Sequence, residues 1–427
     1  MTMYKTLSTN PVIPWRLRQG LERWVESSCR DRRPGLYRWL HFGEARDRLG
    51  AVTFGPKHHF FGYYDKCPWN TSGTRLLAHE ADFNDRPPAA EDSVTIGIVR
   101  LDERNRFQIL ATTRAWNWQQ GSMLQWHPGD PDRLIVHNDR RDGHFVAVVR
   151  DTDGRELNVY DRPIYVMSPE GRYAYSVNFA RLHTHRPGYG YAGGADRWAG
   201  DPHPKDDGIH RLDLLSGRSE LIVSLDELAR IGSNGDARNA FQWINHVQVA
   251  PDGSRLGFFH ICRVGDGGWR ARLFSSASDG ADPTCLLDAD VVSHYDWLDN
   301  RRILIWAKDQ GQPGHFWLVD APQNGRSAVG AGVLVEDGHV SFSPDRRWVL
   351  NDTYPDRHDM RTLMLFRWAD GERIDLARLH SPKSRWWGEI RCDLHPRWSR
   401  DGRQVCIDSV HSGERQMYVA DVGEFVK

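Results

Sequence analysis

Four histidines occupy one matched position in four successive repeats of this 427-residue sequence. Counting seven residues back from each repeat's turn glycine, or from its equivalent, gives Lys66, Met123, Ile164, His246, His294, His339 and His395. Side chains alternate between the faces of a strand, so residues in one register face the same way. The sequence therefore predicts that the four imidazoles meet at one opening. A lone histidine is more often a hydrogen-bonded structural residue, whereas four in register favour a metal or an anionic ligand.

Other polar side chains are predicted at the same opening, because the returning strand of each repeat ends on that side too. They come from the segment before the first repeat, from the second repeat and from a long polar stretch in the third: His59, Tyr63, Asp65 and Lys66; His137, Asn138 and Asp139; Arg181, Arg186, Tyr189 and Tyr191. Tyrosine beside arginine and histidine suits a uronate, whose sugar face stacks on rings and whose carboxylate pairs with a guanidinium.

The elements that must position these residues are seven copies of a turn followed by an arginine and an apolar strand. The seven arginines are Arg75, Arg133, Arg172, Arg255, Arg302, Arg347 and Arg403. Most intervals are about 40–60 residues, the length of a four-stranded propeller blade. We therefore predict an all-β fold, a seven-bladed β-propeller with four-stranded blades. The alternatives are a β-sandwich with coincidental turns, or six or eight blades.

The domain organisation follows from where the repeats begin and where they are interrupted. The one long interval holds a Gly/Pro/Asp-rich stretch, which predicts an insertion at about 181–208 within the third repeat. After it, Ser224 and Glu227 form a capping box that opens a short helix. We assign residues 51–427 to the propeller and residues 1–50 to a peripheral N-terminal extension, with one amphipathic helix after Pro14.

Composition excludes several classes of partner and site. The net charge is -1 and basic residues are not clustered, so nucleic acid is not an expected partner. The six cysteines include no CxxC pair, which argues against a disulfide framework or a zinc ribbon. We find neither an apolar run of signal-peptide length nor a membrane-spanning stretch, and therefore expect a cytoplasmic protein without a membrane span.

Five longer strings carry a resemblance to a known family. They are HFFGYYDKCPW (59–69), WNWQQGSMLQW (116–126), FARLHTHRPGYGY (179–191), EDGHVSFSPD (336–345) and GEIRCDLHPRWSRDG (388–402). Together they resemble a bacterial propeller family similar to ulvan lyases and, more distantly, to oligogalacturonate lyases. The resemblance spans roughly residues 55–427.

This resemblance implies β-elimination on a uronic-acid-containing glycan, an anionic oligosaccharide or polysaccharide. A base removes the proton beside the carboxylate, and a cation neutralises that carboxylate. The resemblance assigns the acid and base to Tyr189, Tyr191 and His137, and neutralisation to Arg181 or Arg186. It implies a divalent metal (zinc, manganese or calcium) at His246, His294 and His339. Substrate contacts are expected from His59, Tyr63, Asp65, Lys66, Gln120, Asn138, Asp139, Arg391 and His395.

One departure and two alternatives remain open. Where the resemblance leads us to expect a first catalytic histidine, the chain has Gln119 and Gln120. A propeller without catalytic activity could bind a glycan or a protein partner at the same opening, as part of surface-polysaccharide biosynthesis. A metal-dependent hydrolase could also use the same histidines.

Overall fold

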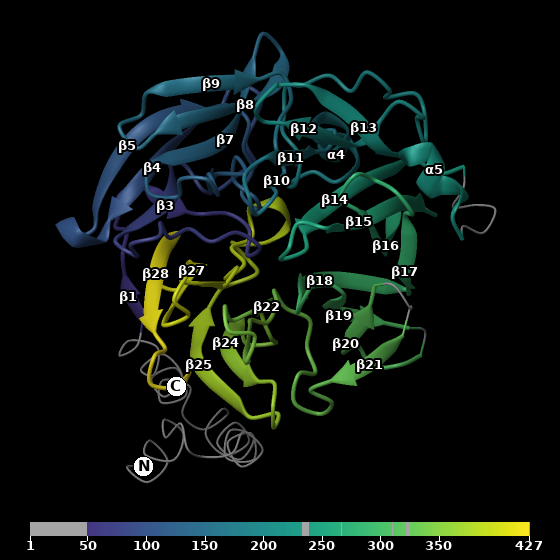
Figure 1. Cartoon of the computed structure of the whole chain (residues 1–427). Helices are drawn as coiled ribbons and strands as arrows, with labels where there is room; N and C mark the ends of the chain where they lie inside the picture. The colour runs from purple at the N-terminus through teal and green to yellow at the C-terminus, as the bar shows by residue number, and fades with distance from the viewer. Residues whose placement is uncertain (1–48, 233–238, 266, 310, 322–324, 427) are drawn as a thin grey trace.

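The computed structural model describes residues 49–232, 239–265, 267–309, 311–321 and 325–426. These residues form seven four-stranded antiparallel sheets arranged in a ring (Figure 1). The predicted seven-bladed β-propeller is confirmed, including the number of blades and of strands in each. The predicted helix after Pro14 lies outside the described residues.

Six blades follow the chain in order, each from its innermost to its outermost strand. Blades 1 to 3 are β2 (His58–Phe60), β3 (Arg75–Ala81), β4 (Val94–Arg100) and β5 (Arg106–Thr113); β6 (Gln125–Trp126), β7 (Leu134–Arg141), β8 (His144–Asp151) and β9 (Glu156–Tyr160); and β10 (Val166–Met167), β11 (Tyr173–Ser176), β12 (Gly208–Asp213) and β13 (Ser219–Ser224). Blades 4 to 6 are β14 (Gln242–Val249), β15 (Arg255–Val264), β16 (Gly268–Ala277) and β17 (Thr284–Asp288); β18 (Val291–Trp297), β19 (Arg302–Lys308), β20 (His315–Asp320) and β21 (Arg326–Val329); and β22 (Ser341–Phe342), β23 (Trp348–Asn351), β24 (Met360–Arg367) and β25 (Arg373–His380).

The seventh blade joins the two ends of the propeller. It consists of β26 (Arg397–Trp398), β27 (Gln404–Ser409), β28 (Gln416–Asp421) and, as its outermost strand, β1 (Leu49–Ala51). Leu49 pairs with Ala420, and Ala51 pairs with Tyr418. Backbone hydrogen bonds therefore close the ring, and residues 49–51 supply the outermost strand of blade 7.

The repeated turns share a physical cause. In three of them a serine hydroxyl accepts a hydrogen bond from the backbone N–H five residues later: Ser168 from Tyr173 at 3.0 Å, Ser343 from Trp348 at 2.9 Å and Ser399 from Gln404 at 2.9 Å. This bond closes the turn, so the strand after it starts in a fixed register. The repeated sequence therefore marks the residue at which each of these strands starts.

The insertion lies between the second and third strands of blade 3. It begins with α4 (Phe179–His185) and returns to the sheet at Gly208. The predicted short helix is α5 (Leu225–Arg230), and the Ser224 hydroxyl accepts from the Glu227 N–H at 3.1 Å, as a capping serine does. Two 3-10 turns, η1 (Leu101–Glu103) and η2 (Gly388–Ile390), complete the elements. Among the described residues, no helix combines the length and apolarity that crossing a membrane requires.

Candidate active site

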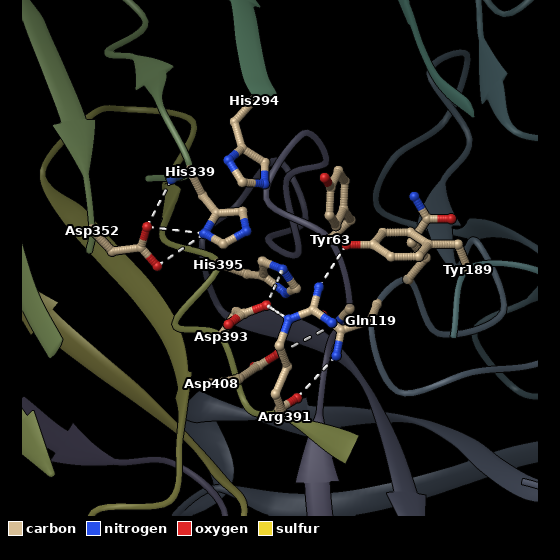
Figure 2. A network of polar contacts seen from close by, with 12 residues as sticks. Tyr63, Gln119, Tyr189, His294, His339, Asp352, Arg391, Asp393, His395 and Asp408 are labelled. Atoms are coloured by element: carbon tan, nitrogen blue, oxygen red, sulfur yellow. Dashed lines mark hydrogen bonds and ion pairs between the residues drawn. The ribbon is translucent and has the colours of Figure 1, made fainter. Parts of the chain in front are cut away.

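The four matched histidines meet near the axis of the propeller, and we call them the axial histidines. Figure 2 shows His294, His339 and His395 side by side; ring centroids lie 4.0 Å apart between His294 and His339 and 4.4 Å between His339 and His395. The His246 and His294 centroids lie 6.5 Å apart. Each is at most 7% exposed. The predicted convergence is therefore confirmed. The matched residues of blades 2 and 3, Met123 and Ile164, are buried apolar side chains.

Irregular backbone aims the axial histidines inward. The ladder between β14 and β15 shifts register between Asn245 and Gln248, around His246, and the ladder between β18 and β19 shifts around His294. His246 and His395 also adopt positive φ, at 53° and 42°, as does Met123 at the matched position of blade 2. Such bulges and left-handed residues re-aim side chains, and they concentrate at functional sites.

Tyr63 fills the space between the axial histidines. Its ring stacks on His246 at 4.9 Å and meets the edge of His395 at 5.0 Å. Its hydroxyl lies 3.4 Å from His246 Nε2. Burial raises the pKa of Tyr63 well above its ordinary value, so the phenol stays protonated. The sequence placed this tyrosine at the opening, and the structure places it at the centre.

Two axial histidines have a carboxylate behind them. His339 Nδ1 lies 2.9 Å from Asp352, and His294 Nδ1 lies 3.1 Å from Asp337. This pairing fixes which ring nitrogen carries the proton and leaves Nε2 of each ring as an acceptor. Metal-binding histidines are commonly held in this way.

The arrangement fits a divalent metal, but the residues that could bind it differ from the predicted ligands. Ligand atoms of His339, Asp393 and His395 lie within 4.8 Å of one another. The Nε2 atoms of His339 and His395 are buried without a hydrogen-bond partner, which a metal would satisfy. Of the predicted ligands His246, His294 and His339, only His339 belongs to this group. His294 adjoins it, whereas His246 faces Tyr63, because the bulge in β14 turns it toward that ring.

Asp393 is a fully buried carboxylate between two arginines. Arg361 donates to it at 2.6 Å and Arg391 at 2.7 Å. Burial alone would raise the pKa of Asp393, but the two guanidiniums hold it well below its usual range. Asp393 therefore stays ionised between the two arginines.

Burial keeps three of the axial histidines, His246, His294 and His395, neutral in the folded protein. Burial lowers the pKa of His246 and His395 well below the ordinary value, and it lowers the pKa of His294 as well. Neighbouring imidazoles and cations act in the same direction. Neutral imidazoles can bind a metal or accept a proton without first losing one.

The insertion reaches this site through Tyr189 and Arg186. The Tyr189 ring lies 5.5 Å from His246, and its hydroxyl accepts a hydrogen bond from Arg391 at 2.6 Å. The Arg186 guanidinium lies between the rings of Tyr189, at 4.9 Å, and Trp269, at 3.9 Å. Gly188 is positioned against Glu389, so the insertion touches the segment that carries Arg391. Both Tyr189 and Arg186 lie where the sequence predicted.

Arg181 and Tyr191, from the same string, do not reach the axial histidines. All five N–H donors of Arg181 are engaged, with Gln242, Asp196, Trp198, Asp201 and Pro202. It therefore anchors the insertion and has no donor left for a substrate carboxylate. Tyr191 stacks on Phe179 at 4.4 Å, and its hydroxyl accepts from Asn138. Its burial between these groups makes it part of the insertion's core.

The predicted residues of blade 2 form a separate structural network. Asn138 donates to the Ile164 carbonyl and accepts from the Ile164 N–H, so it joins blades 2 and 3. His137 is bound by the Asn138 carbonyl on one side and by Arg150 on the other. Asp139 binds Thr113 and the Arg140 N–H. The hydrogen-bond partners of all three are groups of blades 1 to 3 rather than the axial histidines.

The remaining predicted contacts divide between the axis and the blade interfaces. His59 lies between Gln416 and Glu80, at the junction of blades 1 and 7. Gln120 donates to Tyr165 at 2.6 Å. Asp65 and Lys66 form an ion pair at 2.9 Å, with the Lys66 ammonium 5.1 Å from the Tyr165 ring. Arg391 and His395 lie within the site itself.

Sequence reasoning missed Asp393 and Arg361, and it gave Gln119 no positioning role. The signal for Asp393 was its position two residues before His395, a spacing at which both can face one ligand. Gln119 donates to the carbonyls of Glu389 and Arg391 at 3.1 and 2.9 Å, and so holds the Arg391 segment in place. Arg361 is the second residue of β24, where the sequence carries no signal for it.

Known proteins match this chain in structure but not in sequence. No model of a known protein family matches it, and a search of curated proteins finds no match. An oligogalacturonate lyase from Vibrio parahaemolyticus superposes with a TM-score of 0.64 at 14% identity, covering 89% of this chain and 94% of that one. An oligogalacturonate lyase solved in complex with manganese gives 0.64 at 16% identity, covering 88% and 94%. At these identities the likeness shows the propeller fold, and the resemblance to ulvan lyases stays a prediction.

Proposed function

We propose that this protein cleaves a uronic-acid-containing glycan by β-elimination at the axial histidines. The observation that carries the proposal is the convergence, in one buried cluster, of the three kinds of group that the reaction needs. Arg391 supplies a cation, Tyr189 and His246 supply proton-transferring groups, and His339 with Asp393 and His395 can hold a metal. The likeness to oligogalacturonate lyases along most of both chains supports it.

Elimination places separate demands on the cation and on the base. The base takes the proton from the carbon beside the carboxylate, the freed electron pair forms a carbon–carbon double bond, and the glycosidic oxygen leaves with the electrons of its bond. Negative charge develops on the carboxylate, so a cation there lowers the barrier. Three of the five donors of Arg391 bind Asp393, Gly388 and Tyr189. Two remain to pair with the substrate carboxylate.

Tyr189 is the group that we assign to proton transfer. Its oxygen accepts from Arg391, so the positive guanidinium lies against the atom that would carry negative charge after the phenol gives up its proton. The proton on the phenol is then free to reach the leaving oxygen. Neutral His246, 5.5 Å away between ring centroids, can accept the proton taken from the sugar.

A divalent cation bound by His339, Asp393 and His395 would add further positive charge for the substrate carboxylate. Asp352 fixes the orientation of His339, and the two arginines fix that of Asp393. The carboxylate of the sugar would then lie between this group and the free donors of Arg391. The protein would thus hold the metal-binding side chains in position before the substrate binds.

The test is the ultraviolet absorbance of the unsaturated uronate on incubation with a panel of acidic glycans: polygalacturonate, alginate, ulvan and glucuronan. We expect product with at least one glycan, and its loss in Arg391→Ala. His144→Ala, an exposed residue of the β7–β8 hairpin, is the matched control and should retain full activity. Absence of unsaturated product from every glycan, with and without added manganese, contradicts the proposal.

A further inference from the structure

Only two tryptophans of the described chain are more than a third exposed, and both flank the candidate active site. Trp387 is 58% exposed and Trp269 is 39% exposed. Most of the other tryptophans are buried, as their size and apolar surface favour. Single exposed apolar side chains are common on protein surfaces, so exposure alone says little; what is informative is that both tryptophans belong to segments that contact the site.

Trp269 lies at the tip of the β15–β16 hairpin, beside the insertion. Its ring faces the Arg186 guanidinium at 3.9 Å, and Arg186 in turn faces Tyr189 at 4.9 Å. Arg263, its partner across the hairpin, donates to the His185 carbonyl at 2.7 Å. The hairpin is thus attached to the insertion, and Trp269 is held in place by a cation rather than by an apolar neighbour.

Trp387 belongs to the segment that carries Arg391. The preceding Trp386 is 1% exposed and packs with Cys392 and Val410, so it anchors the segment and leaves Trp387 outside. The next residue, Gly388, accepts from Arg391 through its carbonyl at 3.0 Å. Arg385 lies 4.8 Å from the ring of the buried Trp386, two residues before Trp387 in the chain.

We propose that Trp269 and Trp387 are two sugar-binding platforms on which an acidic polysaccharide rests as it crosses the site. An indole face stacks on the apolar face of a sugar ring, and a neighbouring guanidinium pairs with a uronate carboxylate. Arg186 is the guanidinium beside Trp269, whereas the segment of Trp387 carries Arg385 on the neighbouring Trp386. The inference deepens the proposed function, on which it rests: it assigns an extended acidic chain, rather than a single sugar, as the ligand of the same site.

The experiment is calorimetric titration of the intact protein with galacturonate oligomers of two and six sugars, and with oligomers of the other acidic glycans named above. We expect six sugars to bind more tightly than two. In Trp269→Ala and in Trp387→Ala the ratio of the two affinities should fall about tenfold, the size of one lost stacking contact. Trp269→Phe and Trp387→Phe, which keep a ring, should restore most of it.

The control is Leu215→Ala, which truncates a 78% exposed apolar side chain of blade 3 outside the site and should leave the ratio unchanged. Equal length dependence in the tryptophan variants and the unaltered protein overturns the platforms, as does failure of every oligomer to bind. Length-dependent binding that needs both tryptophans, without unsaturated product, supports the platforms and contradicts the lyase. Unsaturated product formed from the six-sugar oligomer at an unchanged rate in both tryptophan variants would support the lyase and contradict the platforms.

Discussion

Arg391 donates a hydrogen bond of 2.6 Å to the hydroxyl of Tyr189, a residue 202 positions away in the chain. The contact joins the insertion of blade 3 to the segment that enters blade 7, next to the axial histidines (Figure 2). Through Arg391 it also reaches Asp393 and the group that can hold a metal.

Tyr189→Phe should lower kcat by about 10²–10⁴-fold, the usual contribution of a positioned acid or base. The ring, with its contacts to Arg186 and His246, would remain, so the melting temperature should change little. Initial rates of unsaturated product formation measure the effect. Tyr191→Phe is the matched control: it also loses a buried hydroxyl of the insertion, and it should keep its activity. Equal losses in the two variants would remove Tyr189 from the reaction.

Arg181→Ala should lower the free energy of unfolding by about 3 kcal/mol, because it leaves the buried Asp196 carboxylate without its guanidinium and removes hydrogen bonds to four carbonyls. Urea unfolding measures this change. Arg197→Ala, an exposed arginine of the same insertion, should have almost no effect. An Arg181→Ala variant as stable as the unaltered protein, yet inactive, would instead favour the catalytic role predicted from the sequence.

Manganese should raise the melting temperature, since a ligand that binds only the folded state stabilises it by about 2.7 kcal/mol at a hundred times its Kd. His339→Ala and His395→Ala should abolish this shift, whereas His246→Ala should retain it. Differential scanning fluorimetry over a manganese series provides the measurement. Loss of the shift in His246→Ala but not in His395→Ala would restore the ligand set predicted from the sequence.

Stability should fall as the pH drops from 7 to 5, in part through two fully buried histidines of blades 1 and 2. Burial lowers the pKa of His79 to about 3 and that of His137 to about 4. The unfolded chain binds protons on these residues below about pH 6.5, while the folded protein does not, so each lowers the free energy of unfolding by about 2 kcal/mol at pH 5.

Urea unfolding of His137→Gln at pH 7 and pH 5 tests this linkage. The loss of stability between the two pH values should be about 2 kcal/mol smaller than in the unaltered protein. His144→Gln, an exposed histidine at the start of β8, should leave the difference unchanged. An identical loss in His137→Gln and the unaltered protein would contradict the assigned protonation.

The fold and the convergence of the axial histidines could be predicted because each repeat sets the register of its strand in the same way. A hydrogen-bonded turn starts each strand at the same phase, as Ser343 and Ser399 illustrate, so a residue counted back from the turn has a known direction. The same count placed His246, His294, His339 and His395 together. The closure by β1 was missed because this three-residue strand has no turn signal before it.

The rest of the site lies in irregular segments, where no period fixes the direction of a side chain. Tyr189 and Tyr191 are two residues apart in one loop, yet one reaches His246 and the other packs on Phe179. Arg181 was predicted at the opening because its type suits a carboxylate. Its actual partners are mostly carbonyls of residues 198–202, and a sequence pattern cannot reveal backbone acceptors.

The products formed from an acidic glycan test the central claim most directly. Mass spectrometry of products from the most strongly bound oligomer should detect one fragment lighter by one water than its saturated counterpart, in the unaltered protein and not in Arg391→Ala. Saturated fragments alone would establish hydrolysis, and an intact oligomer that binds without cleavage would establish a binding propeller. Either result would contradict β-elimination at the axial histidines.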